Sequence, residues 1–295
     1  MGLFDSYKIK SLFKNVVKLE ELGKYEEALE YLDKAEKLDS ENFYVWYNKG
    51  AVFSKLNKYS EALKCYDKSI EINPKNLKAW YNKGNILNNL QKYEQAIKCF
   101  NNAIKLDPNI VQAWNNKGNS FHELGKFKEA INCYDHALKL DPNHSSSWYN
   151  KGNAFRLLGN YKKAIEYYNK AIKLNVEYKE AWFNKGIALG NIGKYNEGLK
   201  CFDKVLKLDP IDKSVWYAKG LVFLQLKKHQ DAINCLNKTL KLDPENVNAW
   251  NYKGIVLAEL EKDEDALKCF NKALNLNPNL TSAKEVKEKI LSSTS

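Results

Sequence analysis

Residues 77–110 read LKAWYNKGNILNNLQKYEQAIKCFNNAIKLDPNI, and the landmarks of this 34-residue stretch recur along the chain. All seven tryptophans stand 34 residues apart, and a glycine follows each of them four residues later. The six prolines keep the same period. Such self-similarity at a fixed spacing indicates an array of repeated structural units. The tryptophans are Trp46, Trp80, Trp114, Trp148, Trp182, Trp216 and Trp250.

Each repeat has the pattern of a helical hairpin. With residue 77 as position 1, positions 4, 8 and 11 hold Trp, Gly and an apolar residue at the spacing of one helix face. Positions 17, 20, 24 and 28 form a second apolar stripe, and small residues at positions 8 and 20 are expected to let the two helices approach closely. Proline at position 32 cannot continue the second helix. Because a single hairpin cannot bury its apolar face alone, the sequence predicts an all-α stack of hairpins.

This pattern resembles the tetratricopeptide repeat (TPR) family. We expect repeats at 43–76, 77–110, 111–144, 145–178, 179–212, 213–246 and 247–280, preceded by an N-terminal extension at 1–8 and a degenerate repeat at 9–42. Residues 281–295 are expected to form a C-terminal capping helix and tail, with Ser282 and Glu285 as the capping box. The resemblance implies a right-handed α-solenoid in which the first helix of each repeat lines a concave groove.

The composition argues against two kinds of partner. No apolar run exceeds about six residues, whereas a membrane-spanning helix needs about 20, so no membrane partner is expected. The net charge of +11 raises the question of nucleic-acid binding. However, the basic residues are lysines spread mainly over second-helix and turn positions, and Arg156 is the single arginine. Nucleic-acid binding is therefore the less favoured alternative.

The residue types that could carry chemistry do not form an active site. All six cysteines occupy position 23, and equivalent positions in stacked repeats lie about 10 Å apart, which is too far for a disulfide. We expect them to be free thiols that fill the core, as suits a reducing cytoplasm. The four histidines stand at four different repeat positions and accompany no nucleophile. We therefore expect no enzymatic activity, no metal and no cofactor.

Position 7 is lysine in every repeat that carries the tryptophan. One interpretation is a structural ladder, in which each stem packs and each ammonium group pairs with an acidic residue such as Asp107 at position 31 of the preceding repeat. The alternative is a basic row that faces a ligand. The sequence favours the structural ladder. The lysines are Lys49, Lys83, Lys117, Lys151, Lys185, Lys219 and Lys253.

The remaining face of the first helix is rich in asparagine and tyrosine. A carboxamide both donates and accepts hydrogen bonds, so it can hold a peptide backbone, and tyrosine adds rigid contact area. These side chains predict a peptide-binding surface; the alternative is that the asparagines are solvated filler. The candidates are Asn48, Asn82, Asn116, Asn150 and Asn184 at position 6, Asn85, Asn119 and Asn153 at position 9, and Tyr47, Tyr81 and Tyr149 at position 5.

The asparagine row resembles the ladder inside the TPR superhelix of O-linked N-acetylglucosamine transferases, which binds the backbone of extended polypeptides, but here it comes without a catalytic domain. The row stops at Ala218 and Tyr252, so the C-terminal part of the groove is expected to bind differently or not at all. Arg156 at position 12, with His122 one repeat earlier, is a candidate anchor for an acidic ligand group; otherwise it is an incidental surface arginine. The carboxylate clamp of chaperone-binding repeats is disfavoured because position 5 is never lysine.

Together these features predict a cytoplasmic, non-enzymatic scaffold or adaptor that holds an extended peptide or a partner helix in its groove. One alternative is the substrate-recruiting subunit of a separate enzyme, such as a glycosyltransferase. Another is homotypic assembly, in which one copy fills the groove of the next. The sequence does not name the protein partner.

Overall fold

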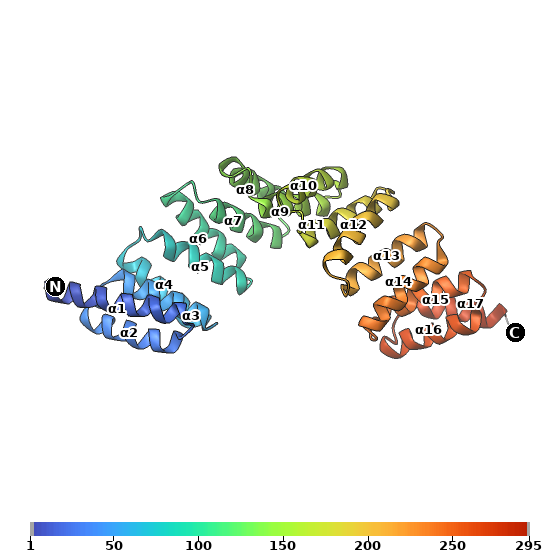
Figure 1. Cartoon of the computed structure of the whole chain (residues 1–295), viewed down its shortest axis with the longest axis horizontal. Coiled ribbons are helices and arrows are strands. Elements are labelled where there is room, and N and C mark those ends of the chain that lie inside the picture. Colours follow the sequence, from blue (N-terminus) through green and yellow to red (C-terminus); the bar gives the residue numbers. More distant parts are fainter. Residues whose placement is uncertain (1–2, 294–295) are drawn as a thin grey trace. The chain divides into compact units, whose positions relative to one another are not determined.

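The computed structural model describes residues 3–293, and this part of the chain consists of helices α1 to α17 joined by short turns (Figure 1). Among the described residues there is no strand. Within each compact unit the two helices of a repeat pack against each other, as α5 does on α6 and α13 on α14, and consecutive hairpins such as α5–α6 and α7–α8 also pack on one another. The expected all-α hairpin repeat is therefore confirmed. The chain divides into two compact units, residues 1–154 and 155–295.

The first unit contains the degenerate repeat and the repeats that follow it. Helix α1 begins at Leu3, so it includes most of the segment that the sequence assigned to an N-terminal extension. The helices are α1 Leu3–Glu21, α2 Tyr25–Leu38, α3 Phe43–Lys55, α4 Tyr59–Ile72, α5 Leu77–Asn89, α6 Tyr93–Leu106, α7 Val111–Glu123, α8 Phe127–Leu140 and most of α9 Ser145–Leu157.

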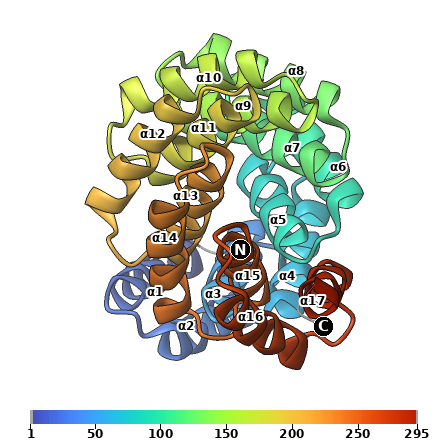
Figure 2. The same cartoon turned by 90° about the vertical axis from the view of Figure 1, so that its right-hand side faces the viewer.

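The second unit contains the end of α9 and the remaining helices, with α13 and α14 side by side as one hairpin (Figure 2). The final helix is the expected cap, but the predicted capping box is wrong. Because α17 already begins at Thr281, Ser282 lies inside its first turn, where its Oγ accepts a hydrogen bond from Asn251 at 3.2 Å. The helices are α10 Tyr161–Leu174, α11 Lys179–Asn191, α12 Tyr195–Leu208, α13 Lys213–Gln225, α14 His229–Leu242, α15 Val247–Glu259, α16 Asp263–Leu276 and α17 Thr281–Ser293.

The glycine at position 8 makes room for the large side chain at position 24, rather than for a second backbone as the sequence suggested. A Cβ atom on Gly118 would lie 2.5 Å from Cε1 of the buried Tyr134 ring. Position 20 faces the backbone of the first helix, since a Cβ on Gly198 would lie 3.0 Å from the backbone oxygen of Gly186. The two small positions therefore have different packing roles.

The tryptophan at position 4 closes the turn between repeats. The Nε1 of Trp114 donates a hydrogen bond to the backbone oxygen of Pro108, six residues earlier, at 3.0 Å. Trp182 makes the same bond at 2.8 Å to Val176, which replaces the proline. The carbonyl group rather than the proline ring is thus what the indole recognises, and this explains why the tryptophan keeps its place where the proline does not.

Two residues after the first helix of each repeat ends, the chain has a residue in the left-handed backbone region. This residue, at position 15, is glycine in four repeats, but Asn57, Gln91, Lys227 and Glu261 adopt φ values of 57°, 57°, 54° and 58°. At the end of α13 the amide of Lys227 bonds to the oxygen of Leu224, and the next amide bonds to Phe223, both at 2.9 Å. This is the Schellman pattern, which favours glycine because other residues are strained there.

Replacing Lys227 by glycine is therefore expected to stabilise the protein by about 1 kcal/mol, because a residue with a side chain is strained in the left-handed backbone region and glycine is not. The reverse change, Gly193→Ala at the equivalent position (φ 76°), is expected to destabilise by a similar amount. Urea unfolding followed by circular dichroism measures both. Equal midpoints for Lys227→Gly and the wild type would contradict the assignment of strain.

Candidate functional site

The position-7 lysines form a structural ladder, but their predicted partner is wrong. Lys151 is buried, and its Nζ lies 2.5 Å from the carboxylate of Asp135, which stands at position 25 of the preceding repeat rather than position 31. The same nitrogen lies 5.7 Å from the centre of the Trp148 ring. Equivalent carboxylate pairs join Lys49 to Asp33, Lys83 to Asp67 and Lys219 to Asp203.

Position 31 instead shapes the turn between repeats, where the Oδ1 of Asp107 accepts a hydrogen bond from the amide of Asn109 at 2.9 Å. Burial acts to lower the pKa of Lys49, but hydrogen bonds to Asp33 and Glu36 raise it overall. For the four lysines that pair with carboxylates, these contacts contradict the interpretation of a basic row that faces a ligand. Lys117, Lys185 and Lys253 likewise lie over tryptophan rings, at 5.0, 5.0 and 5.3 Å from the ring centres.

The six cysteines are buried and free, as expected. Burial raises the pKa of the Cys65, Cys99 and Cys133 thiols to about 11, which keeps them protonated and poorly nucleophilic at neutral pH. Within residues 3–293, His, Cys, Asp and Glu side chains form no group of three that could hold a metal ion. No described helix has the length and apolar character needed to cross a membrane.

The predicted asparagines of the first unit form a hydrogen-bonded row across α5, α7 and α9. The Nδ2 of Asn116 donates to Asn85 Oδ1 at 2.9 Å and to the Tyr81 hydroxyl at 3.2 Å. One repeat later, Asn150 Nδ2 donates to Asn119 Oδ1 at 3.0 Å. Position 6 of one repeat thus bonds to position 9 of the preceding repeat. We call this set of asparagines the carboxamide row.

The row changes character toward the N-terminus. Asn82 donates only a long hydrogen bond, of 3.4 Å, to the Tyr47 hydroxyl, and burial raises the pKa of that tyrosine. Asn48 donates at 2.7 Å to the backbone oxygen of Tyr44 in its own helix. Since no asparagine stands at position 9 of the repeats that precede either residue, the link between repeats that characterises the row is missing there.

Sequence reasoning missed the buried residues that support the row. Asn115 is only 7% exposed, and its Oδ1 accepts from Asn150 Nδ2 at 3.2 Å and from the Ser147 hydroxyl at 2.9 Å. Ser147 in turn lies 2.7 Å from Nδ1 of His144. The signal was present in the sequence, because Asn115 interrupts the aromatic residues at position 5.

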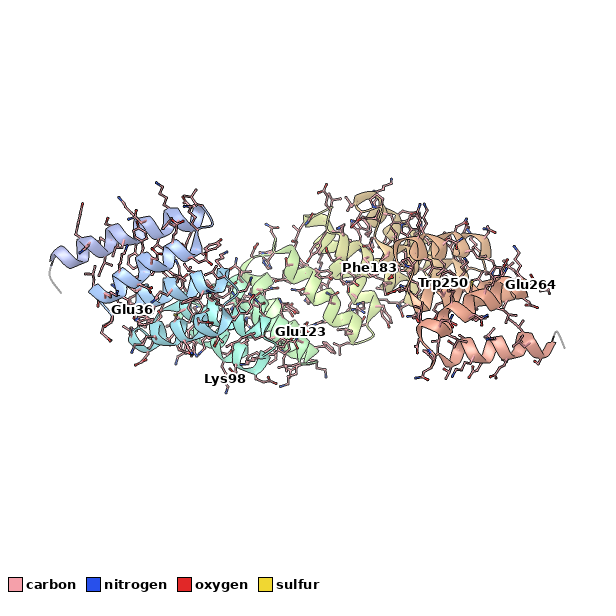
Figure 3. All side chains as sticks on the ribbon, turned by 90° about the horizontal axis from the view of Figure 1, so that it is seen from below. Glu36, Lys98, Glu123, Phe183, Trp250 and Glu264 are labelled. Carbon is pink, nitrogen blue, oxygen red and sulfur yellow. The ribbon has the colours of Figure 1, made fainter. Side chains whose placement is uncertain are left out.

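A polar hollow of about 400 Å³ lies on the carboxamide row. Its wall includes Asn88, whose Oδ1 accepts a hydrogen bond from the Ser120 hydroxyl at 2.7 Å. Glu123, which is labelled in Figure 3, is the charged residue in the lining of this hollow. The other lining residues are Asn85, Asn89, Tyr93, Asn116 and Asn119.

The other predicted site residues lie on α7, α9 and α11. Tyr149 and Asn153 are half-buried on α9, and Asn184 is half-buried on α11 of the second unit. Arg156 is half-buried, and no described residue accepts a hydrogen bond from its buried Nε. His122 packs edge-on against Phe127 with ring centres 5.5 Å apart, and its Nδ1 lies 3.4 Å from the Glu123 carboxylate.

The second unit carries a different kind of cavity on the corresponding face of its first helices. This pocket has a volume of about 570 Å³ and is lined mainly by aromatic and aliphatic side chains. They include Phe183 and Ile187 of α11, Tyr217 and Leu221 of α13, and Tyr252 of α15; Phe183 is labelled in Figure 3. We call this cavity the apolar pocket.

Known structures share this fold over much of the chain. YrrB, described as a TPR protein with an unusual peptide-binding site, is 22% identical, with a TM-score of 0.56 over 64% of this chain and 97% of its own. A TPR protein from Parabacteroides merdae is 20% identical, with a TM-score of 0.63 over 84% and 98% of the two chains. MamA from Desulfovibrio magneticus is 22% identical, with a TM-score of 0.55 over 58% and 97%. At these identities the likeness concerns the fold.

Family models identify the repeats directly. Among curated proteins there is no significant match. The tetratricopeptide repeat model matches residues 43–76, 77–110, 111–144, 145–178, 180–212, 214–246 and 247–280. A second TPR model matches residues 19–57, over parts of the degenerate repeat and its successor. With most of its length matched, the chain belongs to the tetratricopeptide repeat family.

Proposed function

We propose that this protein is a non-catalytic interaction scaffold and that the carboxamide row of its first unit binds an extended peptide through the peptide backbone. Tetratricopeptide repeats generally serve as protein-interaction scaffolds, which supports the broader part of the proposal. The peptide-binding site named for YrrB supports the kind of ligand. The observation that carries the finer proposal is the hydrogen-bond inventory of the row.

The row leaves donors exposed at position 9. Asn119 Oδ1 already accepts two hydrogen bonds, from Asn150 Nδ2 and, at 2.9 Å, from the Tyr134 hydroxyl. Asn85 Oδ1 is likewise occupied by Asn116. Within the described part of the chain, no residue accepts a hydrogen bond from the Nδ2 of Asn85 or Asn119. These two amide groups can therefore donate to carbonyl groups of a ligand.

At position 6 the row leaves an acceptor on Asn150, whereas Asn116 Oδ1 already accepts a hydrogen bond from Asn115 Nδ2 at 3.1 Å. Both hydrogens of Asn150 Nδ2 are used, on Asn119 and Asn115, while its Oδ1 has no donor among the described residues. The row thus offers N–H groups at one position and a carbonyl oxygen at the other. An extended peptide also alternates unpaired N–H and C=O groups, so its backbone complements this pattern regardless of side-chain sequence.

Asn119→Asp tests the proposal because it exchanges the free donor for an acceptor but keeps an oxygen for Tyr134 and Asn150. Linear peptides selected from a display library on the full-length chain serve as the probe. Their affinity, measured by fluorescence anisotropy, is expected to fall about tenfold or more, or about 1.4 kcal/mol. The thermal midpoint is expected to remain within about 2 °C of the wild type.

The matched control is Asn132→Asp, which makes the same chemical change at an exposed second-helix position outside the row. It is expected to leave peptide affinity unchanged and so corrects for the added negative charge. If Asn119→Asp binds the selected peptides as tightly as Asn132→Asp, the asparagines are filler and the proposal fails. Sedimentation of the free protein at several concentrations separates binding of peptides from homotypic assembly.

A further inference from the structure

We infer that the apolar pocket of the second unit binds an amphipathic helix, which it receives by its apolar face. The inference rests on the proposed scaffold function but concerns a different surface from the carboxamide row. The pocket is built from the same repeat positions as that row. Positions 9 and 6, which hold Asn85 and Asn116 in the first unit, hold Ile187 and Ala218 here.

Because the pocket has no carboxamide row, it favours a helical ligand over an extended one. An extended peptide would bring unpaired N–H and C=O groups against Ile187, Leu221 and Tyr252, where an unsatisfied polar group is costly. In a helix the backbone groups are already paired internally, so only side chains need to be accommodated. Helix binding in apolar grooves works in this way.

The polar side chains around the pocket are mostly engaged. Asn191 Nδ2 donates to the oxygen of Ile187 at 2.9 Å, and Asn246 Oδ1 caps α15 through the amide of Ala249 at 2.9 Å. Gln225 is exposed. The carboxamides that do line the pocket therefore do not reproduce the linked donors and acceptors of the first unit.

Charge in the pocket is also neutralised. Lys213 is the charged residue among the lining side chains, and its Nζ lies 3.0 Å from the carboxylate of Asp243. Burial raises the pKa of Tyr217 to about 12, which keeps its hydroxyl neutral. A cavity of about 570 Å³ whose lining lysine is ion-paired has room for more than one large apolar side chain, and a helix presents such side chains at successive turns.

Gly190 allows the pocket to be blocked without disturbing the core. It lines the pocket near the end of α11, and a Cβ built on it would meet only Val222 Cγ2, at 4.0 Å. A phenylalanine at this position is therefore expected to fill the cavity without steric strain at its Cβ, and to improve helix propensity. Gly190→Ala makes the same backbone change without filling the cavity.

The test selects binders on the full-length chain from a display library of amphipathic helices randomised on one face. Selected helices are expected to lose about tenfold or more in affinity on Gly190→Phe and to be unaffected by Gly190→Ala. A proline placed at the centre of a selected helix should abolish its binding. Circular dichroism is expected to show that both variants unfold no earlier than the wild type.

Three outcomes would overturn the inference: no enriched helix, helices that bind Gly190→Phe as well as wild type, or binders that tolerate the central proline. If Gly190→Phe instead weakened the binding of linear peptides, the pocket would be shown to bind an extended segment. Because Asn119→Asp alters only the carboxamide row, it is expected to leave helix binding unchanged. Failure here is thus distinguishable from failure of the proposed function.

Discussion

Gly118→Ala is expected to destabilise the protein by about 2 kcal/mol, although alanine is normally the better helix former by about 1 kcal/mol. The added Cβ would lie 2.5 Å from Cε1 and 2.8 Å from Cδ1 of Tyr134. That ring cannot move aside, because it is 1% exposed and its hydroxyl donates to Asn119. Overpacking of this kind generally costs about 1–3 kcal/mol. Because this ring is held by burial and by its hydroxyl bond, we expect a cost at or above the upper limit, which the gain in helix propensity only partly offsets.

The chain supplies a matched control in Gly220→Ala. There the large residue at position 24 is Leu236, and the new Cβ would lie 3.1 Å from its Cγ and 3.2 Å from its Cδ2. An aliphatic side chain can shift by the required few tenths of an ångström, so a stability change near zero is expected. Urea unfolding of both variants checks the difference. An equal loss at the two glycines would show that the ring at position 24 is not the cause.

A second variant tests the contact itself. Tyr134→Leu places in the first unit the pair that Gly220 and Leu236 form in the second. On its own this change loses packing and the hydroxyl bond to Asn119. Gly118→Ala is expected to be nearly neutral in that background, so that the two substitutions are strongly non-additive. Additive losses would contradict a direct clash between residues 118 and 134.

The repeat and its helices could be predicted because they depend on local spacing. Tryptophan, glycine and proline landmarks mark the period, and proline at position 32 marks where a second helix ends. Partners across helices were harder to assign. Positions 25 and 31 both carry aspartates, and only the packing of the second helix against the next repeat selects Asp135 rather than Asp141 as the partner of Lys151.

The candidate site could be predicted only in part for the same reason. The sequence shows where asparagines stand, but the orientation of each carboxamide depends on its neighbours, as Asn119 between Tyr134 and Asn150 illustrates. The apolar pocket was visible only as the loss of asparagine at Ala218 and Tyr252, because its volume depends on how several helices pack. That the row and the pocket bind partners stays a prediction.

Trp114→Ala is expected to destabilise the protein by about 3 kcal/mol, at the lower end of the range for removing a large aromatic side chain because this one is half-buried. Three contacts disappear together. The indole nitrogen donates to Pro108, the ring stacks on His136 with centres 4.3 Å apart and planes at 15°, and Lys117 Nζ lies 5.0 Å from its centre. The loss falls on the boundary between two repeats.

The position of the damage should be measurable as well as its size. Since repeat arrays are stabilised by nearest-neighbour interfaces, hydrogen exchange is expected to accelerate most in α6 and α7, which flank the Pro108 turn. Trp114→Phe keeps a ring for His136 and Lys117 but loses the donor, so it should lose only about 1 kcal/mol. If Trp114→Phe were as damaging as Trp114→Ala, the indole bond to Pro108 would be the dominant contact, and the stacking on His136 would contribute little. Uniform acceleration along the whole chain would instead show that this tryptophan supports the array globally rather than one interface.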